Sequence, residues 1–124
     1  MIIKNKPHNK FTLITDAMRA KGMPDGLSEL GGQTVIVKNG EARLENGALA
    51  GSVLKMNDAI KNLVSAGILF TDAVDFATIN PANNLGVGKN KGSIKVGKDA
   101  DFAVLDKEFN VVMTVRGGKV IYKR

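Results

Sequence analysis

Residues 11–16 read Phe-Thr-Leu-Ile-Thr-Asp, and they indicate the fold class more directly than any other part of the chain. The first five side chains are aromatic, aliphatic or β-branched, and both polar ones among them are threonines. A short strand that is apolar on both faces is typical of a parallel sheet covered on both sides. We therefore expect a strand over residues 11–15, although no second run of this kind follows that could pair with it in parallel.

Asp16 is the first candidate functional residue, because it directly follows the predicted strand. In α/β enzymes, catalytic side chains gather at the carboxyl ends of parallel strands. An aspartate at such a position also commonly caps the turn that follows. Position alone leaves both interpretations open.

A long loop and a β-hairpin are predicted after Asp16. Residues 19–32 contain one proline and four glycines, a composition typical of a loop. Two alternating runs, residues 33–38 and 41–45, are joined by an Asn-Gly pair at positions 39 and 40. Such a pair predicts a hairpin, since both residues accept the positive φ angles of a type I′ turn. A second Asn-Gly turn at residues 46–47 ends the hairpin.

Two helices and a further helical turn are predicted in the middle of the chain. Apolar residues recur with helical spacing over residues 53–66, with Ser52 as the N-cap and Gly67 as the closing residue. A second helix is expected from Thr71, as its N-cap, to about residue 79. Asn80 is then expected to cap another helical turn.

The last third of the chain predicts a basic loop followed by three strands. Glycines and lysines are interspersed over residues 86–98. Strands are expected over residues 101–105, 111–116 and 119–122, and the Gly-Gly pair between the last two predicts a second hairpin.

The basic loop is interpreted as a loop with solvated lysines. The segment that starts at Gly92 has the spacing of a phosphate-binding loop, but Asp99 replaces the hydroxyl residue that would hold magnesium. Lysines attract nucleic acid through counterion release. However, the chain has only five Phe and one Tyr, most of them in core-like positions, so stacking platforms for bases are missing. We therefore expect no nucleic-acid partner.

Composition excludes several classes of chemistry. The 124 residues fit one ordinary domain, with 18 Lys and Arg against 12 Asp and Glu and a net charge of +6. Without cysteine, the chain has no thiolate nucleophile and no sulfur-bound zinc. The single histidine, His8, lies in a polar segment and is predicted to be exposed and not catalytic. No apolar run reaches the roughly 18 residues of a membrane span, and no signal peptide is evident, so we expect a cytoplasmic protein without a membrane partner.

Several segments, taken together, resemble the N-acetylglucosamine-6-phosphate deacetylase family of the metal-dependent amidohydrolase superfamily. They comprise residues 13–18, 22–26, 29–32, 49–52 and 80–82. A further segment, residues 91–101, resembles the C-terminal signature that many amidohydrolases share. The resemblance runs in order from about residue 10 to residue 122 and corresponds to the C-terminal third of the family.

The resemblance implies an α/β fragment of a larger fold. Residues 1–87 would be the C-terminal segment of a (β/α)8 barrel, with its last strand ending at Asp16, a β-hairpin insert and the closing helices. Residues 88–124 would supply the C-terminal strands of a small β-sandwich. The missing parallel neighbours of residues 11–15 would then lie in the part of the enzyme that this chain does not contain.

The resemblance also implies an activity and its residues. The family hydrolyses the acetamide of N-acetylglucosamine 6-phosphate to glucosamine 6-phosphate and acetate, in amino-sugar catabolism. Asp16 matches the family's catalytic aspartate, a carboxylate that takes a proton from water and returns it to the leaving amine. Leu49, Ala50 and Gly51 match a loop that contacts the substrate.

A divalent metal, zinc or iron, is implied for the full-length enzyme, where it would activate the water. In the family its ligands are a glutamate and histidines that precede the last barrel strand, whereas this chain has one histidine. We therefore expect no metal to be held by this chain, and we expect a C-terminal fragment or truncated product that is inactive alone.

The implied partners are an amino-sugar phosphate substrate and the missing N-terminal part of the enzyme. Apolar surfaces that the rest of the barrel would cover lead us to expect a homo-oligomer. Two alternatives remain open. One is a non-catalytic binding or assembly module that uses the basic loop. The other is an amidohydrolase that acts on a cyclic amide, against which the long loop and hairpin argue by resemblance.

Overall fold

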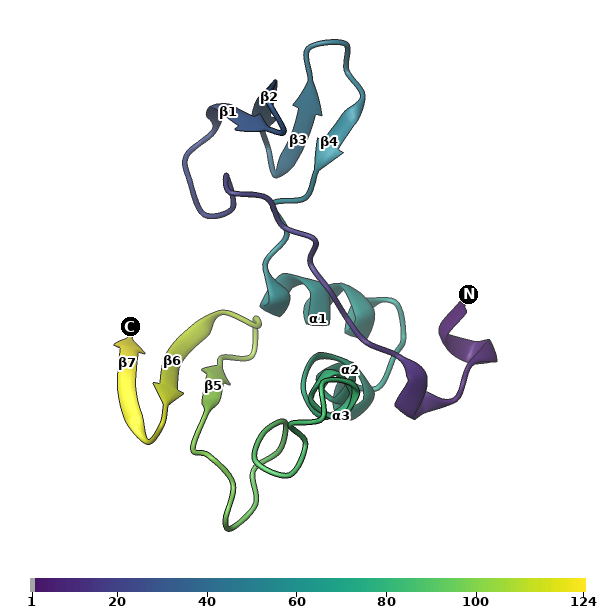
Figure 1. Ribbon diagram of the computed structural model, residues 1–124, viewed down its shortest axis with the longest axis vertical. Coiled ribbons are helices and arrows are strands. Elements are labelled where there is room, and N and C mark those ends of the chain that lie inside the picture. Colours follow the sequence, from purple (N-terminus) through teal and green to yellow (C-terminus); the bar gives the residue numbers. More distant parts are fainter. Residues whose placement is uncertain (1) are drawn as a thin grey trace. The chain divides into compact units, whose positions relative to one another are not determined.

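The computed structural model describes residues 2–124, which form two compact units. The hairpin unit comprises residues 14–59, and the mixed unit comprises residues up to 13 together with residues 60–124. The hairpin unit contains strands β1 (Gly26–Leu30), β2 (Gln33–Lys38), β3 (Glu41–Leu44) and β4 (Leu49–Gly51) (Figure 1). Helix α1 (Met56–Ser65) begins in the hairpin unit and ends in the mixed unit. The mixed unit contains the short 3-10 helices η1 (Ile2–Asn5) and η2 (His8–Lys10), helices α2 (Phe70–Ala77) and α3 (Ile79–Asn84), and strands β5 (Phe102–Leu105), β6 (Val111–Arg116) and β7 (Lys119–Lys123).

The predicted hairpin is confirmed as the centre of a four-stranded antiparallel sheet in the order β1-β2-β3-β4. Asn39 and Gly40 have φ angles of 53° and 79°, which is the positive pair that a type I′ turn requires. One face of the sheet carries the buried side chains of the unit's core. This core consists of Val35, Val37 and Ala42 from the sheet and Met18 and Ala20 from the preceding segment.

Strand β1 corrects the prediction of a continuous loop over residues 19–32. It reads Gly-Leu-Ser-Glu-Leu, and with only two apolar side chains it carries little strand signal. Pairing with β2 nevertheless supplies a complete antiparallel register from Gly26↔Val37 to Leu30↔Gln33. The Gly-Gly pair at residues 31–32 forms the two-residue turn between these strands, with positive φ at both positions.

The predicted strand over residues 11–15 is not formed. Phe11 has the extended backbone angles of a strand, and the Leu13 N–H donates a hydrogen bond of 2.8 Å to the carbonyl of Phe76 in α2. Ile14 is 68% exposed. A strand of a parallel sheet needs neighbouring strands that bond to its edges. Within residues 2–124, none of the strands pairs with residues 11–15, so this segment does not become a strand.

Helix α1 begins later than predicted, so Ser52 is not its N-cap. The Ser52 hydroxyl instead accepts a hydrogen bond of 3.0 Å from the N–H of Leu54 in a turn that precedes the helix. The predicted end is confirmed. Gly67 has a φ of 86°, and its N–H and that of Ile68 donate to carbonyls of the last helical turn, at 3.0 and 3.1 Å.

Helices α2 and α3 follow each other with only Thr78 between them, and both predicted caps are wrong. Leu69 occupies the N-cap position of α2, so Thr71 lies within the first turn. Asn80 lies inside α3 and is 4% exposed. Its side-chain amide donates hydrogen bonds of 2.8 Å to the carbonyls of His8 and Phe11, which fixes the N-terminal segment on α3.

His8 is more constrained than the sequence predicts. Its two ring nitrogens lie 3.7 Å from a carboxylate oxygen of Asp72 and 3.4 Å from one of Asp75, both on α2. Its ring centroid lies 4.8 Å from that of Phe76. The imidazole therefore packs on the helix, although its side chain remains 43% exposed.

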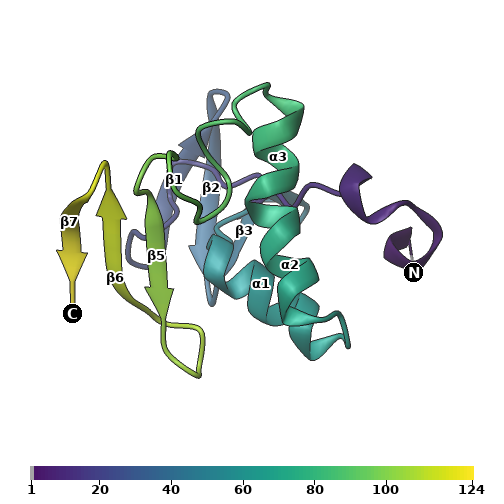
Figure 2. The same ribbon diagram turned by 90° about the horizontal axis from the view of Figure 1, so that it is seen from below.

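The three C-terminal strands are confirmed to within one residue at each end, as a sheet in the order β5-β6-β7 (Figure 2). Neighbouring strands are antiparallel, and the Gly-Gly pair at residues 117–118 forms the turn between β6 and β7 with φ angles of 54° and 75°. In the loop that precedes β5, the Lys91 ammonium contacts the carboxylates of Asp99, at 2.8 Å, and Asp101. The Lys98 ammonium donates to the carbonyls of Gly88 and Lys91. Two of the loop's lysines are thus bound within the loop rather than solvated.

Across residues 2–124, no helix has both the length and the apolar character needed to cross a bilayer.

Candidate functional site

Asp16 has an uncommon backbone conformation for a residue other than glycine. Its φ angle is +48°, in the left-handed region, and its side chain is exposed. Aspartate enters this region more readily than most residues, yet a cost of about 1–2 kcal/mol is typical for an L-residue there. Non-glycine residues held in such conformations cluster at functional sites.

A short parallel contact places the Asp16 segment beside the end of β4. Ala17 forms a parallel β-bridge with Ser52. The N–H of Met18 donates a hydrogen bond of 2.8 Å to the carbonyl of Ser52. Because Ser52 directly follows Gly51, the structure brings Asp16 and the residues 49–51 into one unit within a few residues of this bridge.

The three candidate substrate-contacting residues form β4 itself. Leu49 is 70% exposed, and Ala50 packs against the core of the hairpin unit. A register shift sets Gly51 opposite Ala42 and Leu49 opposite Arg43, so Ala50 is the extra residue of a β-bulge. A Cβ built on Gly51 would lie 3.4 Å from the sulfur of Met18, so the β4 backbone rests closely on that side chain.

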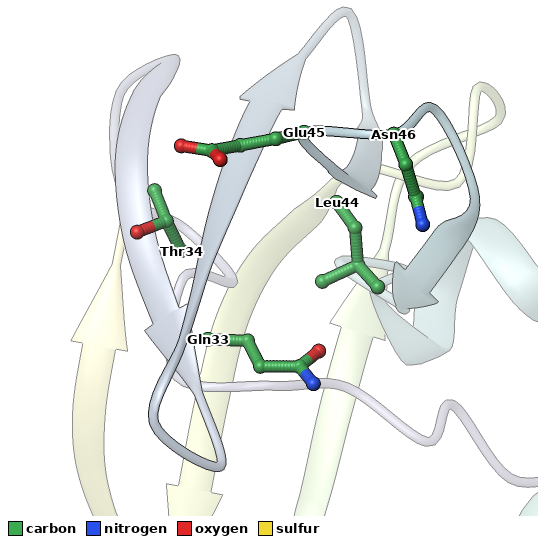
Figure 3. Close-up of a pocket in the computed structure, with 5 residues that line it drawn as sticks. All are labelled: Gln33, Thr34, Leu44, Glu45 and Asn46. Carbon is green, nitrogen blue, oxygen red and sulfur yellow. The ribbon is translucent and has the colours of Figure 1, made fainter.

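Two shallow pockets in the hairpin unit do not include Asp16 or β4. One, of about 380 Å³, is lined by residues from the start of β2, the end of β3 and the turn that follows β3: Gln33, Thr34, Leu44, Glu45 and Asn46 (Figure 3). The other, of about 280 Å³, lies in the loop and strand that follow Asp16 and is lined by Arg19, Ala20, Met23, Pro24, Asp25, Gly26, Leu27, Ser28 and Val37. The sequence predicts neither pocket, because each combines strand residues with turn or loop residues that only the folded hairpin unit brings together.

The residues that the structure describes do not fit the metal that the resemblance implies. Among residues 2–124, no group of three or more His, Cys, Asp or Glu side chains could hold a metal ion. His8 lies beside Asp72 and Asp75, but each ring nitrogen faces a different carboxylate. Ligands for a metal must therefore come from elsewhere if the chain acts in a metalloenzyme.

Three ionisable groups of the mixed unit have pKa values that are shifted by their neighbours. The Lys91 ammonium, followed by the Gly117 N–H, lowers the pKa of Asp101 below its usual value. Asp101, followed by Asp99, raises the pKa of Lys91. A hydrogen bond from the Asn110 side chain lowers the pKa of Asp106. These contacts hold the loop and the strand ends together.

Comparison with known proteins gives a family match along nearly the whole chain. The sequence profile described as "Amidohydrolase family" matches residues 8–121. N-acetylglucosamine-6-phosphate deacetylase of Bacillus subtilis is 41% identical over 118 residues, which are 94% of this chain and 30% of that protein. The putative N-acetylgalactosamine-6-phosphate deacetylase of Escherichia coli K12 is 42% identical over 103 residues, which are 82% of this chain and 62% of that protein.

Solved structures give the same result. N-acetylglucosamine-6-phosphate deacetylase of Thermotoga maritima matches with a TM-score of 0.88 and 38% identity over 99% of this chain and 34% of that one. A variant of the Mycobacterium smegmatis enzyme, solved in complex with N-acetyl-D-glucosamine-6-phosphate, matches with a TM-score of 0.83 and 33% identity over 96% of this chain and 32% of that one. The chain thus spans about a third of the length of these structures and of the Bacillus subtilis relative.

Proposed function

Because this chain belongs to the amidohydrolase family, we propose that it forms the C-terminal part of an N-acetylglucosamine-6-phosphate deacetylase. The proposal is supported by the names of the relatives that align with almost the whole chain. The reaction would hydrolyse the acetamide of N-acetylglucosamine 6-phosphate and release glucosamine 6-phosphate and acetate. We expect the enzyme to act in the cytoplasm.

The division into residues 1–87 of a (β/α)8 barrel and residues 88–124 of a small β-sandwich is part of this proposal. Residues 11–15 would be the last barrel strand, and α1 and α2 would be closing helices. The extended but unpaired backbone near Phe11 supports this role, because such a strand requires partners from the rest of the enzyme.

Asp16 would act as the general base and then the general acid. Its carboxylate would accept a proton from the water that attacks the amide carbonyl carbon. As the C–N bond breaks, the same group would return the proton to the departing amine nitrogen. The observation that carries this assignment is the left-handed backbone of Asp16, one residue before the bridge that joins it to Ser52 at the end of β4.

Strand β4 would contact the sugar through its backbone. It is an edge strand of the four-stranded sheet, so half of its N–H and C=O groups point away from β3. On this strand, Leu49 has an exposed side chain, and Gly51 has no Cβ that would keep a ligand from its backbone. Such an edge can donate to and accept from the hydroxyl groups of a sugar while the neighbouring carboxylate of Asp16 faces the amide.

Members of the amidohydrolase family are in general metal-dependent, and the described residues of this chain do not fit a metal. We therefore propose that the chain is inactive by itself and that the remaining part of the enzyme supplies the ligands. The contribution of this chain would be the proton transfer at Asp16 and the substrate contacts of β4.

N-acetylgalactosamine 6-phosphate is a second candidate substrate. It differs from the first in the configuration of one hydroxyl group, and the Escherichia coli K12 relative named for it is 42% identical to this chain. The amide that Asp16 would serve is the same in both sugars. The choice between them depends on contacts to that hydroxyl group.

A chimera tests the proposal. This chain would replace the matching 118-residue segment of the Bacillus subtilis relative, and acetate release would be measured with both sugar phosphates. We expect the chimera to be active and the Asp16→Asn variant to lose roughly 10²–10⁴-fold in kcat, the range typical of a lost general acid–base group.

The control variant is Glu45→Gln, which also removes one carboxylate from an exposed position of the hairpin unit. It should keep the kcat of the chimera. A folded chimera that is inactive, or an Asp16→Asn variant as active as the Glu45→Gln variant, would contradict the proposal.

A further inference from the structure

Met18 links the candidate carboxylate to the candidate substrate strand through both its backbone and its side chain. Its N–H donates a 2.8 Å hydrogen bond to the carbonyl of Ser52, directly after β4. Only Ala17 separates Met18 from Asp16, and Ala17 makes the parallel bridge to the same Ser52. The hydrogen bond of Met18 is part of this bridge, which joins the segment directly after Asp16 to the end of β4.

The side chain of Met18 packs against β4 from the core side of the sheet. It is 9% exposed and belongs to the core of the hairpin unit. A Cβ on Gly51 would lie 3.4 Å from the Met18 sulfur and 3.5 Å from a methyl carbon of Leu30, so Gly51 rests on these two side chains. Ala50, the bulged residue of β4, packs against the same core.

From this arrangement we infer that Met18 is a positioning residue. Its side chain sets the distance between the β4 backbone and the carboxylate of Asp16. The inference rests on the proposed function, since it concerns the distance between the substrate strand and the acid–base group. The backbone changes direction at Asp16, where φ is left-handed. Two residues later, the side chain of Met18 lies in the core next to Gly51. Removing the Met18 side chain would leave a void beneath Gly51 and let β4 shift toward it.

Such a shift would affect the chemical step more than substrate binding. The backbone contacts of β4 to the sugar would change their distance from the Asp16 carboxylate. A misplacement of about 1 Å between reacting groups can lower a rate by roughly 100-fold. We expect Met18→Ala to lower kcat of the chimera by at least about tenfold with little change in KM, and Met18→Leu, which keeps the volume, to restore most of the rate.

A double-mutant cycle separates positioning from a purely structural effect. If Met18 acts through Asp16, Met18→Ala lowers kcat in the native background and has no further effect in the Asp16→Asn background. Val35→Ala serves as the control, because Val35 is fully buried in the same core, whereas the three atoms nearest to a Cβ on Gly51 belong to Met18 and Leu30. It should lower stability and leave the kcat of the folded chimera unchanged.

Equal losses from Met18→Ala in both backgrounds would overturn the inference and leave the proposed function intact. Loss of the proposed function is recognised separately, by a chimera with unaltered Asp16 that folds but releases no acetate. Amide hydrogen exchange on this chain alone provides a readout that does not depend on activity. The Met18 amide should exchange slowly in the native chain and at least about tenfold faster in Met18→Ala; rapid exchange in the native chain, or unchanged exchange in Met18→Ala, would overturn the inference.

Discussion

Asp16 is the only aspartate or glutamate within residues 2–124 whose backbone has a positive φ. The other non-glycine residues with this property are Asn39, in a hairpin turn, and Phe109. Glycine adopts this conformation without the contact between Cβ and the following carbonyl that strains other residues. The chain therefore carries a carboxylate where the backbone alone favours glycine, which fits a residue retained for its side chain.

Comparing Asp16→Ala with Asp16→Gly isolates this backbone cost. Both changes remove the carboxylate, but only alanine keeps a Cβ at a φ of +48°. We expect Asp16→Ala to have a free energy of unfolding about 1 kcal/mol lower than Asp16→Gly. Urea denaturation of the two variants measures the difference. Equal stability would show that the left-handed conformation is not kept in solution.

The sequence can predict the location of Asp16 but not its conformation. An apolar run followed by a carboxylate is a local signal for a candidate site residue, and the catalytic role of Asp16 stays a prediction. The φ angle depends on the contacts of Ala17 and Met18 with Ser52, which is distant in sequence. Met18 itself carries no local signal, because a methionine beside an apolar run is an ordinary core residue.

Among the elements, the two predicted hairpins were correct because their turns are specified locally by Asn-Gly and Gly-Gly pairs. The strand predicted over residues 11–15 is not formed in this chain, because its pairing requires partners that residues 2–124 do not provide. The cap assigned to Asn80 was wrong for a long-range reason. Its side-chain amide donates hydrogen bonds to the carbonyls of His8 and Phe11 and does not cap the start of α3.

Asn80 should contribute strongly to the stability of the mixed unit. Asn80→Ala removes two hydrogen bonds of 2.8 Å from a residue that is 4% exposed and leaves the carbonyls of His8 and Phe11 without these donors. We expect a loss of about 2 kcal/mol in the free energy of unfolding. The matched change is Asn84→Ala, which removes one exposed hydrogen bond, to Thr12, and should cost less than about 1 kcal/mol. Urea unfolding that ranks the two variants in the opposite order would contradict this.

The contacts of Asp101 predict a pH dependence for the strand ends of β5 and β6. The Lys91 ammonium and the Gly117 N–H lower the pKa of Asp101 in the folded chain. A carboxyl with a lowered folded pKa contributes stability above its unfolded pKa and loses it as the pH falls through the folded pKa. Asp101→Asn should therefore weaken the loss of stability on acidification.

Thermal unfolding between neutral and strongly acidic pH checks this expectation. Glu108→Gln is the control of equal charge change, since no ion pair links the Glu108 side chain to the rest of the described chain. An Asp101→Asn variant with the same acid profile as the native chain would be evidence against the Lys91–Asp101 contact.

For the whole molecule, exposed apolar side chains are the main feature that bears on assembly. In the mixed unit, they include Ile94 and Val96 in the loop before β5, 87% and 108% exposed, and Ile121 in β7, 62% exposed. Exposed apolar side chains of this kind lose contact with water when another chain covers them, which favours association. Lys119 and Lys123 lie at the two ends of β7, and charges there limit indiscriminate strand pairing.

We therefore expect the chain alone to form oligomers. Light scattering on a sizing column should give a mass above that of one chain, and the mass should rise with concentration. The variant Ile121→Lys, which places a charge in the middle of β7, should shift the distribution toward the monomer; Lys95→Arg, in the basic loop, should not. A single monomer peak for the native chain at all concentrations would contradict the expectation.

The central claim, that Asp16 transfers the proton of the reaction, is tested most directly by the rate of acetate release from the chimera that carries Asp16→Gly. Glycine removes the carboxylate while it relaxes the backbone, so a lower rate cannot be attributed to strain at this position. We predict a loss of roughly 10²–10⁴-fold in kcat, with part of the rate recovered when formate is added as a free carboxylate. An Asp16→Gly chimera that releases acetate at the rate of the unaltered chimera would contradict the claim.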